Sequence, residues 1–253
     1  KELKHIEEAQ LQDVKNFFFK HYTPANAILV VAGNVETENV MQLAEKWFGP
    51  IPAGEKYVRQ LPKEPAQTEA RTLEIKADVP LDAFVKTWHM ASRLERGYYV
   101  TDLISDILGG GASSRLYEAL IKEKKLFSSI ECYHFGSIDN GLLAIEGKLV
   151  KGVNIDDAHR AVNVEVEKMK TELVDEKELQ KVINKTESTI LFEDMSVMSR
   201  ANSLAYYELL GDAELMNDEL QRYQSITAQE LLDESKKIFD EKNSNTLYYL
   251  SKN

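Results

Sequence analysis

The string most suggestive of chemistry is a glycine-rich turn, Leu108-Gly-Gly-Gly-Ala-Ser-Ser-Arg-Leu-Tyr117. A glycine-rich turn that leads into a helix can bind an anion through exposed backbone N–H groups and the helix dipole. This string lacks the Lys-Ser/Thr ending of a phosphate loop, and a predicted helix rather than a strand precedes it. A tight helix–helix turn explains the same pattern without a ligand, with glycine ending one helix and Ser113 or Ser114 capping the next.

The histidines and the single cysteine do not form a recognisable metal or nucleophile motif. No two histidines are three or four residues apart, and neither His-Glu-x-x-His nor its inversion occurs. Cys132 and His134 are two apart on a predicted strand and could share a metal ion. With no other ligand pair nearby, a small buried thiol and a hydrogen-bonded imidazole are the preferred interpretation. The residues alone therefore contain no self-sufficient catalytic constellation.

Charge and hydropathy exclude two classes of partner. The 253 residues include 31 Lys and Arg against 42 Asp and Glu, a formal net charge of −11. Nucleic-acid binding is not expected, because neutralising phosphates requires clustered basic residues. No apolar run approaches the roughly 18 residues that a membrane helix needs, so no membrane segment is predicted. One cysteine permits no internal disulfide.

The elements that would position these residues fall on two sides of a proline-rich linker. All six prolines precede residue 81, and Leu61-Pro-Lys-Glu-Pro65 reads as a linker. Before it, the patterns predict a helix over 6–21, a buried apolar strand over 26–33 and a helix around 40–47. A helix–strand–helix cannot bury a sheet face alone, so partner strands for 26–33 must come from elsewhere. We place the domain boundary at about residue 63, giving 1–62 and 63–253.

The part after the linker alternates strands and helices before it becomes almost entirely helical. The hydrophobic patterns predict strands over 71–77 and 83–90, helices over 98–108 and 114–125, a β-hairpin over 128–136 and 141–149, helices through 154–240, and a last strand over 246–250. Asn154 is a predicted helix start, and Asp175 and Thr227 resemble the first residues of capping boxes.

An internal repeat of plan links the two parts. Residues 226–250 repeat the order of residues 9–31: an amphipathic helix, a short polar break with asparagine, then an apolar strand. The identity is low, so the repeat is structural. It predicts that the chain spans the tail of one unit and the whole of a second, similar unit. The chain also opens on Lys1 rather than methionine, so we expect it to be a fragment of something longer.

Two long strings together resemble the insulinase/pitrilysin family of zinc metallopeptidases. They are His21-Tyr-Thr-Pro-Ala-Asn-Ala-Ile-Leu-Val-Val-Ala-Gly-Asn34, followed by a helix ending on Phe48-Gly49, and the glycine-rich string 108–117. The resemblance implies an α+β fold like that of mitochondrial processing peptidase. A mostly antiparallel sheet would pack under helices in two layers, with the tail of a preceding similar domain at 1–62 and a complete second, inactive domain at 63–253.

The resemblance also implies where the chemistry of the parent protein lies. In that family a zinc ion held by an inverted His-x-x-Glu-His and a distal Glu activates water for peptide hydrolysis. That site belongs to the first domain and would lie upstream of this chain, which is then expected to hold no zinc, no metal ligand and no catalytic residue. Many relatives carry an Arg and, seven residues later, a Tyr that bind substrate. Ile121 and Ser128 occupy those positions here and do not match.

The implied function is the C-terminal, non-catalytic part of a zinc-dependent metalloendopeptidase, inactive alone and forming part of a peptide-binding chamber. The implied partners are an upstream catalytic domain of the same polypeptide, a peptide substrate, and a second subunit supplying the Arg/Tyr pair. The candidate substrate-binding residues are Gly109, Gly110, Gly111, Ser113, Ser114 and Arg115. Two alternatives stay open: a scaffold or assembly subunit without proteolysis, and an anion-binding domain centred on the glycine turn.

Overall fold

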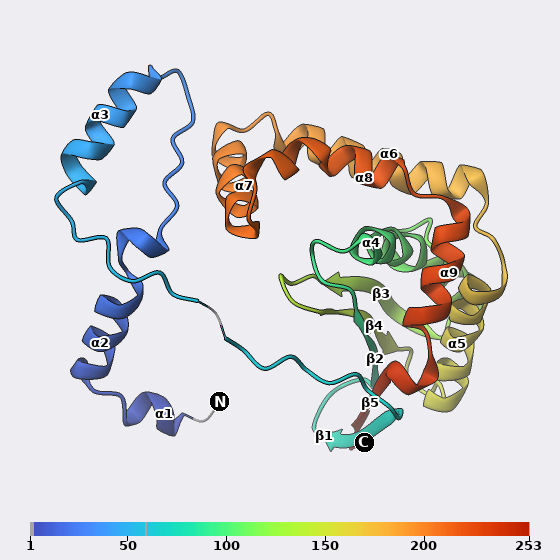
Figure 1. Ribbon diagram of the computed structural model, residues 1–253. Helices are drawn as coiled ribbons and strands as arrows, with labels where there is room; N and C mark the ends of the chain where they lie inside the picture. The colour runs from blue at the N-terminus through green and yellow to red at the C-terminus, as the bar shows by residue number, and fades with distance from the viewer. Residues whose placement is uncertain (1–2, 59, 253) are drawn as a thin grey trace. The chain divides into compact units, whose positions relative to one another are not determined.

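The computed structural model describes residues 3–58 and 60–252, and these divide into two compact units (Figure 1). The sheet unit consists of Pro65–Ile190 and the residues from Asp218 onward. The small unit consists of the described residues up to Glu64 together with Leu191–Asn217.

The sheet unit contains five strands and most of the helices. Its strands are β1 (Arg71–Ala77), β2 (Ala83–Met90), β3 (Phe127–Phe135), β4 (Gly141–Leu149) and β5 (Ser244–Ser251). Its helices are α4 (Arg96–Gly109), the π-helix η2 (Tyr117–Glu123), α5 (Ile155–Thr171), most of α6 (Glu176–Glu193), α8 (Glu219–Gln224), α9 (Ala228–Ile238) and the 3₁₀ turn η4 (Glu241–Asn243).

The strands form one sheet in the order β1-β5-β2-β4-β3. Only β1 and β5 are parallel; the other neighbouring pairs are antiparallel. The mostly antiparallel sheet with helices on it confirms the α+β class. The bounds predicted for β1, β2 and the second strand of the hairpin are those observed, and the first strand of the hairpin is shifted by one residue at both ends.

The core lies between the sheet and the helices α4, α5 and α9 (Figure 1). Alternate residues of β2, including Phe84 and Trp88, point into it, as the period of two in a strand requires. α4 contributes Leu103, Ile104 and Ile107, which are fully buried at spacings of one, three and four. Burying each such side chain contributes about 1.5–3 kcal/mol. This packing fixes the end of α4, where the glycine turn begins.

Two of the three predicted helix starts are formed as expected. The side chain of Asn154 accepts hydrogen bonds from the backbone N–H groups of Asp156 and Asp157 at the start of α5. Thr227 and Glu230 form a reciprocal capping box at the start of α9. The third is only half formed: Asp175 accepts from the Lys177 N–H, but the carboxylate three residues on is turned toward another element, as described below.

The helix predicted over 114–125 is wound more widely than expected. Residues 117–123 form the π-helix η2, and Lys124 donates its N–H to the carbonyl of Ala119, five residues back. Leu116 and Leu120 both lie in the core. The sequence pattern gave the position of the helix correctly but could not distinguish the two windings.

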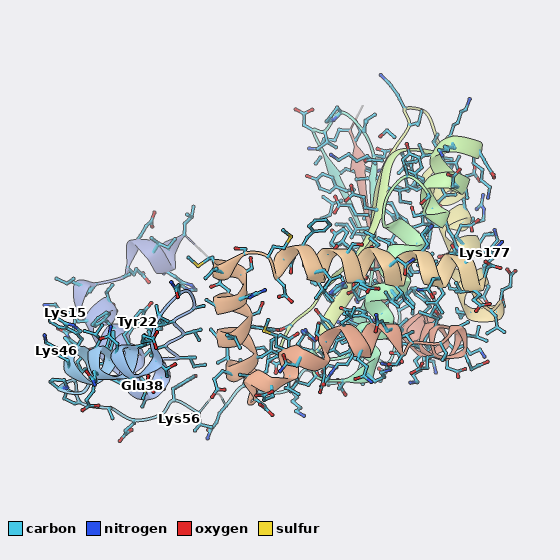
Figure 2. The ribbon with its side chains drawn as sticks, turned by 90° about the horizontal axis from the view of Figure 1, so that it is seen from above. Lys15, Tyr22, Glu38, Lys46, Lys56 and Lys177 are labelled. Atoms are coloured by element: carbon cyan, nitrogen blue, oxygen red, sulfur yellow. The ribbon has the colours of Figure 1, made fainter. Side chains whose placement is uncertain are left out.

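The small unit consists of short helices and extended chain. Its elements are α1 (Lys4–Glu7), α2 (Leu11–His21), the 3₁₀ turn η1 (Pro24–Asn26), α3 (Thr37–Phe48), α7 (Val197–Leu210) and most of the 3₁₀ stretch η3 (Ala213–Asp218). The side chains of Lys15 on α2, of Tyr22 directly after it and of Lys46 on α3 can be followed in Figure 2.

The buried strand predicted over 26–33 is not formed among the residues that the structure describes. Residues 27–32 pair with no strand, and Ile28, Leu29 and Val31 are exposed. The physical reason is the one that the sequence already suggested: a single apolar strand between two helices has no ladder partner in its own segment. The apolar faces of α2 and α3, including Phe18 and Trp47, are exposed as well, because without a paired strand there is no sheet on which they can pack.

Candidate functional site

The glycine-rich turn joins α4 to η2 beside β3, an edge strand of the sheet. Gly109 lies so close to β3 that a Cβ added there would overlap the backbone nitrogen of Cys132. Gly110 is the C-cap of α4. Gly111 has φ of +107°, which favours glycine, and open space around its Cα. The first glycine thus allows close packing, and the third reverses the chain.

Helix α6 holds the turn and the end of α4 through two ion pairs and a lysine that donates to Ser113. Arg115 donates from Nε and Nη2 to the two carboxylate oxygens of Glu178, at 3.1 and 2.6 Å. Lys181 Nζ donates to the carbonyl and the Oγ of Ser113, at 3.1 and 3.3 Å. Lys185 Nζ pairs with Asp106 of α4 at 2.6 Å. Because 178, 181 and 185 are three and four residues apart, they lie on one face of α6.

Neither serine of the turn caps the next helix in the described part of the chain. The hydroxyl of Ser113 receives Lys181, and no side-chain cap is formed at the start of η2. Ser114 is 2% exposed, and its Oγ has no hydrogen-bond partner among the described residues. The N-cap role predicted for Ser113 or Ser114 is therefore wrong. A wider π turn and a lysine from α6 replace it.

The polar groups beside the turn are hydrogen-bonded to one another. Asp102 of α4 accepts from Tyr223 Oη at 2.6 Å and lies 3.2 Å from His134 Nδ1. Burial alone would raise the pKa of Asp102, but the hydrogen bonds and charge of its partners, His134 foremost, hold it below its usual value. Burial, followed by the negative charge of Asp102, raises the pKa of Tyr223. The network fixes α4 against β3.

The pair Cys132 and His134 does not form a metal site with neighbouring groups. Cys132 is buried, and burial raises the pKa of its thiol. His134 is engaged by Asp102 and by Tyr98 Oη, 3.2 Å from Nε2. Within residues 3–58 and 60–252, no group of three or more His, Cys, Asp or Glu side chains is arranged to hold a metal ion. The described residues therefore do not fit a zinc site.

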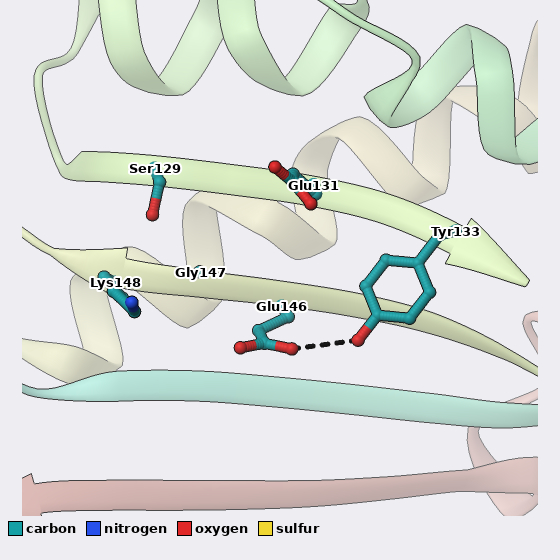
Figure 3. A pocket seen from close by; sticks show the side chains of 6 residues that line it. All are labelled: Ser129, Glu131, Tyr133, Glu146, Gly147 and Lys148. Atoms are coloured by element: carbon teal, nitrogen blue, oxygen red, sulfur yellow. Dashed lines mark hydrogen bonds between the residues drawn. The ribbon is translucent and has the colours of Figure 1, made fainter.

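Apart from the glycine turn, a hollow lies on the face of β3 and β4 that is turned away from the helices (Figure 3). It measures about 410 Å³ and is lined by Ser129, Glu131, Tyr133, Glu146, Gly147 and Lys148. Glu131 and Glu146 are directly opposite each other across the two strands. The sequence reasoning missed this site. Alternation within the predicted hairpin puts 131 and 133 on one face, but only the register reveals which residues of β4 they meet.

The described helices give no candidate for a membrane span, since none is both long enough and apolar enough to cross a bilayer.

Comparison with known proteins shows where this fold recurs. Residues 8–186 match the family model described as "Peptidase M16 inactive domain". The zinc protease PqqE of Helicobacter pylori is 24% identical over 246 residues, which are 96% of this chain and 55% of that protein. This chain thus spans about half the length of that relative.

Solved structures share the architecture at low sequence identity. A protease from Helicobacter pylori superposes with a TM-score of 0.89 at 23% identity, over 98% of this chain and 61% of that one. A peptidase M16 inactive domain from Pseudomonas fluorescens gives a TM-score of 0.82 at 17% identity, over 98% and 58% of the two chains. At these identities the likeness shows the fold.

Proposed function

This chain belongs to the peptidase M16 inactive-domain family, and from that membership we propose that it forms one wall of a peptide-enclosing chamber in a zinc-dependent metalloendopeptidase. The observation that carries the proposal is the match of a family model named for an inactive domain to residues 8–186, together with relatives named zinc proteases. The zinc ion would be held by another part of the parent protein and would there activate water for peptide hydrolysis. This chain would contribute binding and enclosure.

The glycine turn is the part of the sheet unit that we assign to peptide contact. Its tip, Gly111 to Ser113, is exposed. The buried Ser114 and the ion pair of Arg115 with α6 fix the tip to the rest of the sheet unit. The turn lies beside an edge strand, and an edge strand can receive the backbone of an extended peptide. Gly109 would serve by letting the chain pass close to β3, and Gly110 by ending α4. The six residues 109–111 and 113–115 would thus act through their backbone and shape.

The small unit is proposed to include the end of the preceding catalytic domain, with the boundary at 62/63. An extended apolar segment at 27–32 lies unpaired, and an apolar groove of about 760 Å³ runs between α2, that segment and α3. Phe18, Tyr22 and Phe48 line it. A strand and a helix face of this kind are stable when another sheet covers them. The upstream domain of the same polypeptide would supply that sheet.

A second subunit would supply the substrate-binding Arg/Tyr pair, which this chain does not carry at the corresponding positions. In the resemblance described above, an Arg/Tyr pair binds substrate over the zinc site, and Ile121 and Ser128 stand at those positions here. We propose that a partner subunit carries the pair.

Two glycines that are alike in local structure provide the test. Gly111 and Gly152 both have positive φ and open space around the Cα, but Gly152 lies in the turn between β4 and α5. In the parent protein, Gly111→Val should raise KM for a peptide several-fold with kcat little changed, and Gly152→Val should leave both unchanged. Equal effects of the two substitutions on KM would contradict the proposal. A parent without any peptidase activity would favour the scaffold alternative.

A further inference from the structure

The sheet face turned away from α4, α5 and α9, here called the open face, presents a lateral row that crosses all five strands. The row is Leu73, Leu247, Val85, Glu146 and Glu131, in the strand order β1-β5-β2-β4-β3. Three apolar side chains are thus followed by two carboxylates. With neighbouring strands about 4.8 Å apart, the row is roughly 19 Å long, the length of about six residues of extended peptide.

The apolar end of the row is accessible. Leu73 is 57% exposed, and Val85 and Leu247 are partly exposed. Tyr249 lies in the adjacent row and is also partly exposed. Apolar surface of this kind on a sheet face is stabilised when another apolar group covers it.

In the described chain, the two carboxylates at the acidic end of the row have no ion-pair partner. Glu131 and Glu146 are both exposed and directly opposed, an arrangement that is unfavourable between like charges. Throughout residues 3–58 and 60–252, no Lys or Arg forms an ion pair with either carboxylate. Lys148 shares the hollow but forms no ion pair with them, and Arg71 belongs to the opposite edge strand.

Tyr133 fixes one of the two carboxylates in place. Its hydroxyl donates to Glu146 Oε2 at 2.9 Å across the strands (Figure 3). Burial, followed by the hydrogen bond and charge of Glu146, raises the pKa of Tyr133 to about 12, so the phenol remains a donor at neutral pH. The Glu146 carboxylate is therefore held over the hollow, with its other oxygen free to accept from a ligand.

The charge and shape of this face identify one kind of occupant. Two carboxylates with no third His, Cys, Asp or Glu beside them in the described chain do not form a metal cage, whereas they match the donors of a Lys or Arg side chain. We propose that the open face binds an extended peptide whose apolar side chain covers Val85 and Leu247 and whose Lys or Arg lies between Glu131 and Glu146. This inference rests on the proposed function, because it names the class of peptide that the chamber wall prefers.

Direct binding to this chain tests the inference without requiring proteolysis. Two fluorescein-labelled, unstructured peptides of about six residues would be compared by anisotropy, one with a leucine and an arginine and the other with glutamine in place of the arginine. The wild-type chain should bind the arginine peptide about tenfold more tightly, and the preference should weaken as salt is raised. In the double variant E131Q/E146Q the two peptides should bind alike.

Glu74→Gln is the matched control. Glu74 is another exposed strand glutamate, but the register puts it beside Tyr248 on the opposite face of the sheet. This variant should keep the tenfold preference. Equal binding of both peptides to the wild type, or a preference that survives in E131Q/E146Q, would overturn the basic-peptide inference while leaving the chamber-wall function intact. Failure of the arginine peptide to bind the wild type would also overturn it, whereas the KM comparison of Gly111 and Gly152 variants tests the wall function independently.

Discussion

Lys86→Met should reduce the loss of stability that this protein suffers in mild acid. Lys86 is 1% exposed on β2, with its Nζ 3.3 Å from Asn163 Oδ1, 3.3 Å from Glu241 Oε2 and 3.5 Å from His159 Nε2. The other ring nitrogen of His159 is 2.6 Å from Tyr248 Oη. Protonating this histidine would therefore bring a second cation beside a buried ammonium group.

The sign of the effect follows from the shifted pKa of the histidine. Burial, followed by the charge of Lys86, lowers the pKa of His159 below its ordinary value, while Glu241 and Asp156 act in the opposite direction. The unfolded chain then takes up the proton first as the pH falls. The stability due to neutral His159 is complete above about pH 6.5, and it is lost as the pH falls from there through the lowered pKa of the folded state.

The size of the effect can be worked from the 3.5 Å separation. Two unit charges at that distance repel by about 1 kcal/mol in bulk water and about 5 kcal/mol at an effective dielectric constant of about 20. The carboxylate of Glu241 cancels part of this repulsion, and His159 is only partly buried, so we expect a net effect of about 1 kcal/mol. Removing the ammonium group costs little in return, because the Glu241 side chain is 71% exposed.

Urea denaturation at pH 7 and pH 5, followed by circular dichroism, measures the effect. The wild type should lose about 1 kcal/mol more free energy of unfolding between these pH values than Lys86→Met does. His159→Gln should reduce the loss at least as much, because it removes the titrating group itself, and adding Lys86→Met to it should change nothing further. Lys151→Met, at an exposed lysine in the turn after β4, is the control and should behave as the wild type. An identical pH dependence in Lys86→Met and the wild type would show that Lys86 does not destabilise the protonated form of His159 in the folded protein.

Three further substitutions test the packing and capping described above. Gly109→Ala places a Cβ on the backbone of Cys132 and should lower the free energy of unfolding by about 2 kcal/mol, measured by urea denaturation; no loss would contradict the close approach. Thr227→Ala removes the cap of α9 and should lower the same quantity by about 1 kcal/mol, whereas Thr227→Ser should retain it. Arg115→Met breaks the ion pair with Glu178 and should speed amide hydrogen exchange in residues 109–115, while Arg160→Met, at an exposed arginine of α5, should not.

Local patterns predicted the elements that are completed within the sheet unit. Alternation and flanking turn residues located β1, β2 and the hairpin, because the strands with which these segments pair lie in the same chain. The segment 26–33 has an equally clear strand pattern, yet it remains unpaired among the described residues because no ladder partner is at hand. A strand pattern in the sequence shows that a segment can pair in a sheet. Whether a neighbouring strand is present depends on the tertiary structure.

The candidate site was predictable in position but not in its contacts. The glycines and serines indicated a turn between two helices, which the structure confirms. The partner of Arg115 could not be predicted, because the sequence offered Glu178 a local role in a capping box. In the structure Glu178 instead forms a long-range ion pair with Arg115. That Glu131 and Glu146 lie directly opposite each other could not be predicted either, since it depends on the register of the hairpin. Long-range pairing is the information that local spacing lacks.

The division of labour between a zinc-bearing part of the parent protein and this non-catalytic part can be measured as peptide cleavage. Cleavage is followed for the parent protein, with and without a zinc chelator, and for residues 1–253 alone. We expect the parent, together with any partner subunit, to cleave an unstructured peptide and to lose this activity when zinc is removed, while residues 1–253 alone release no product. Cleavage by residues 1–253 alone, or a parent whose activity is indifferent to zinc, would contradict this division of labour.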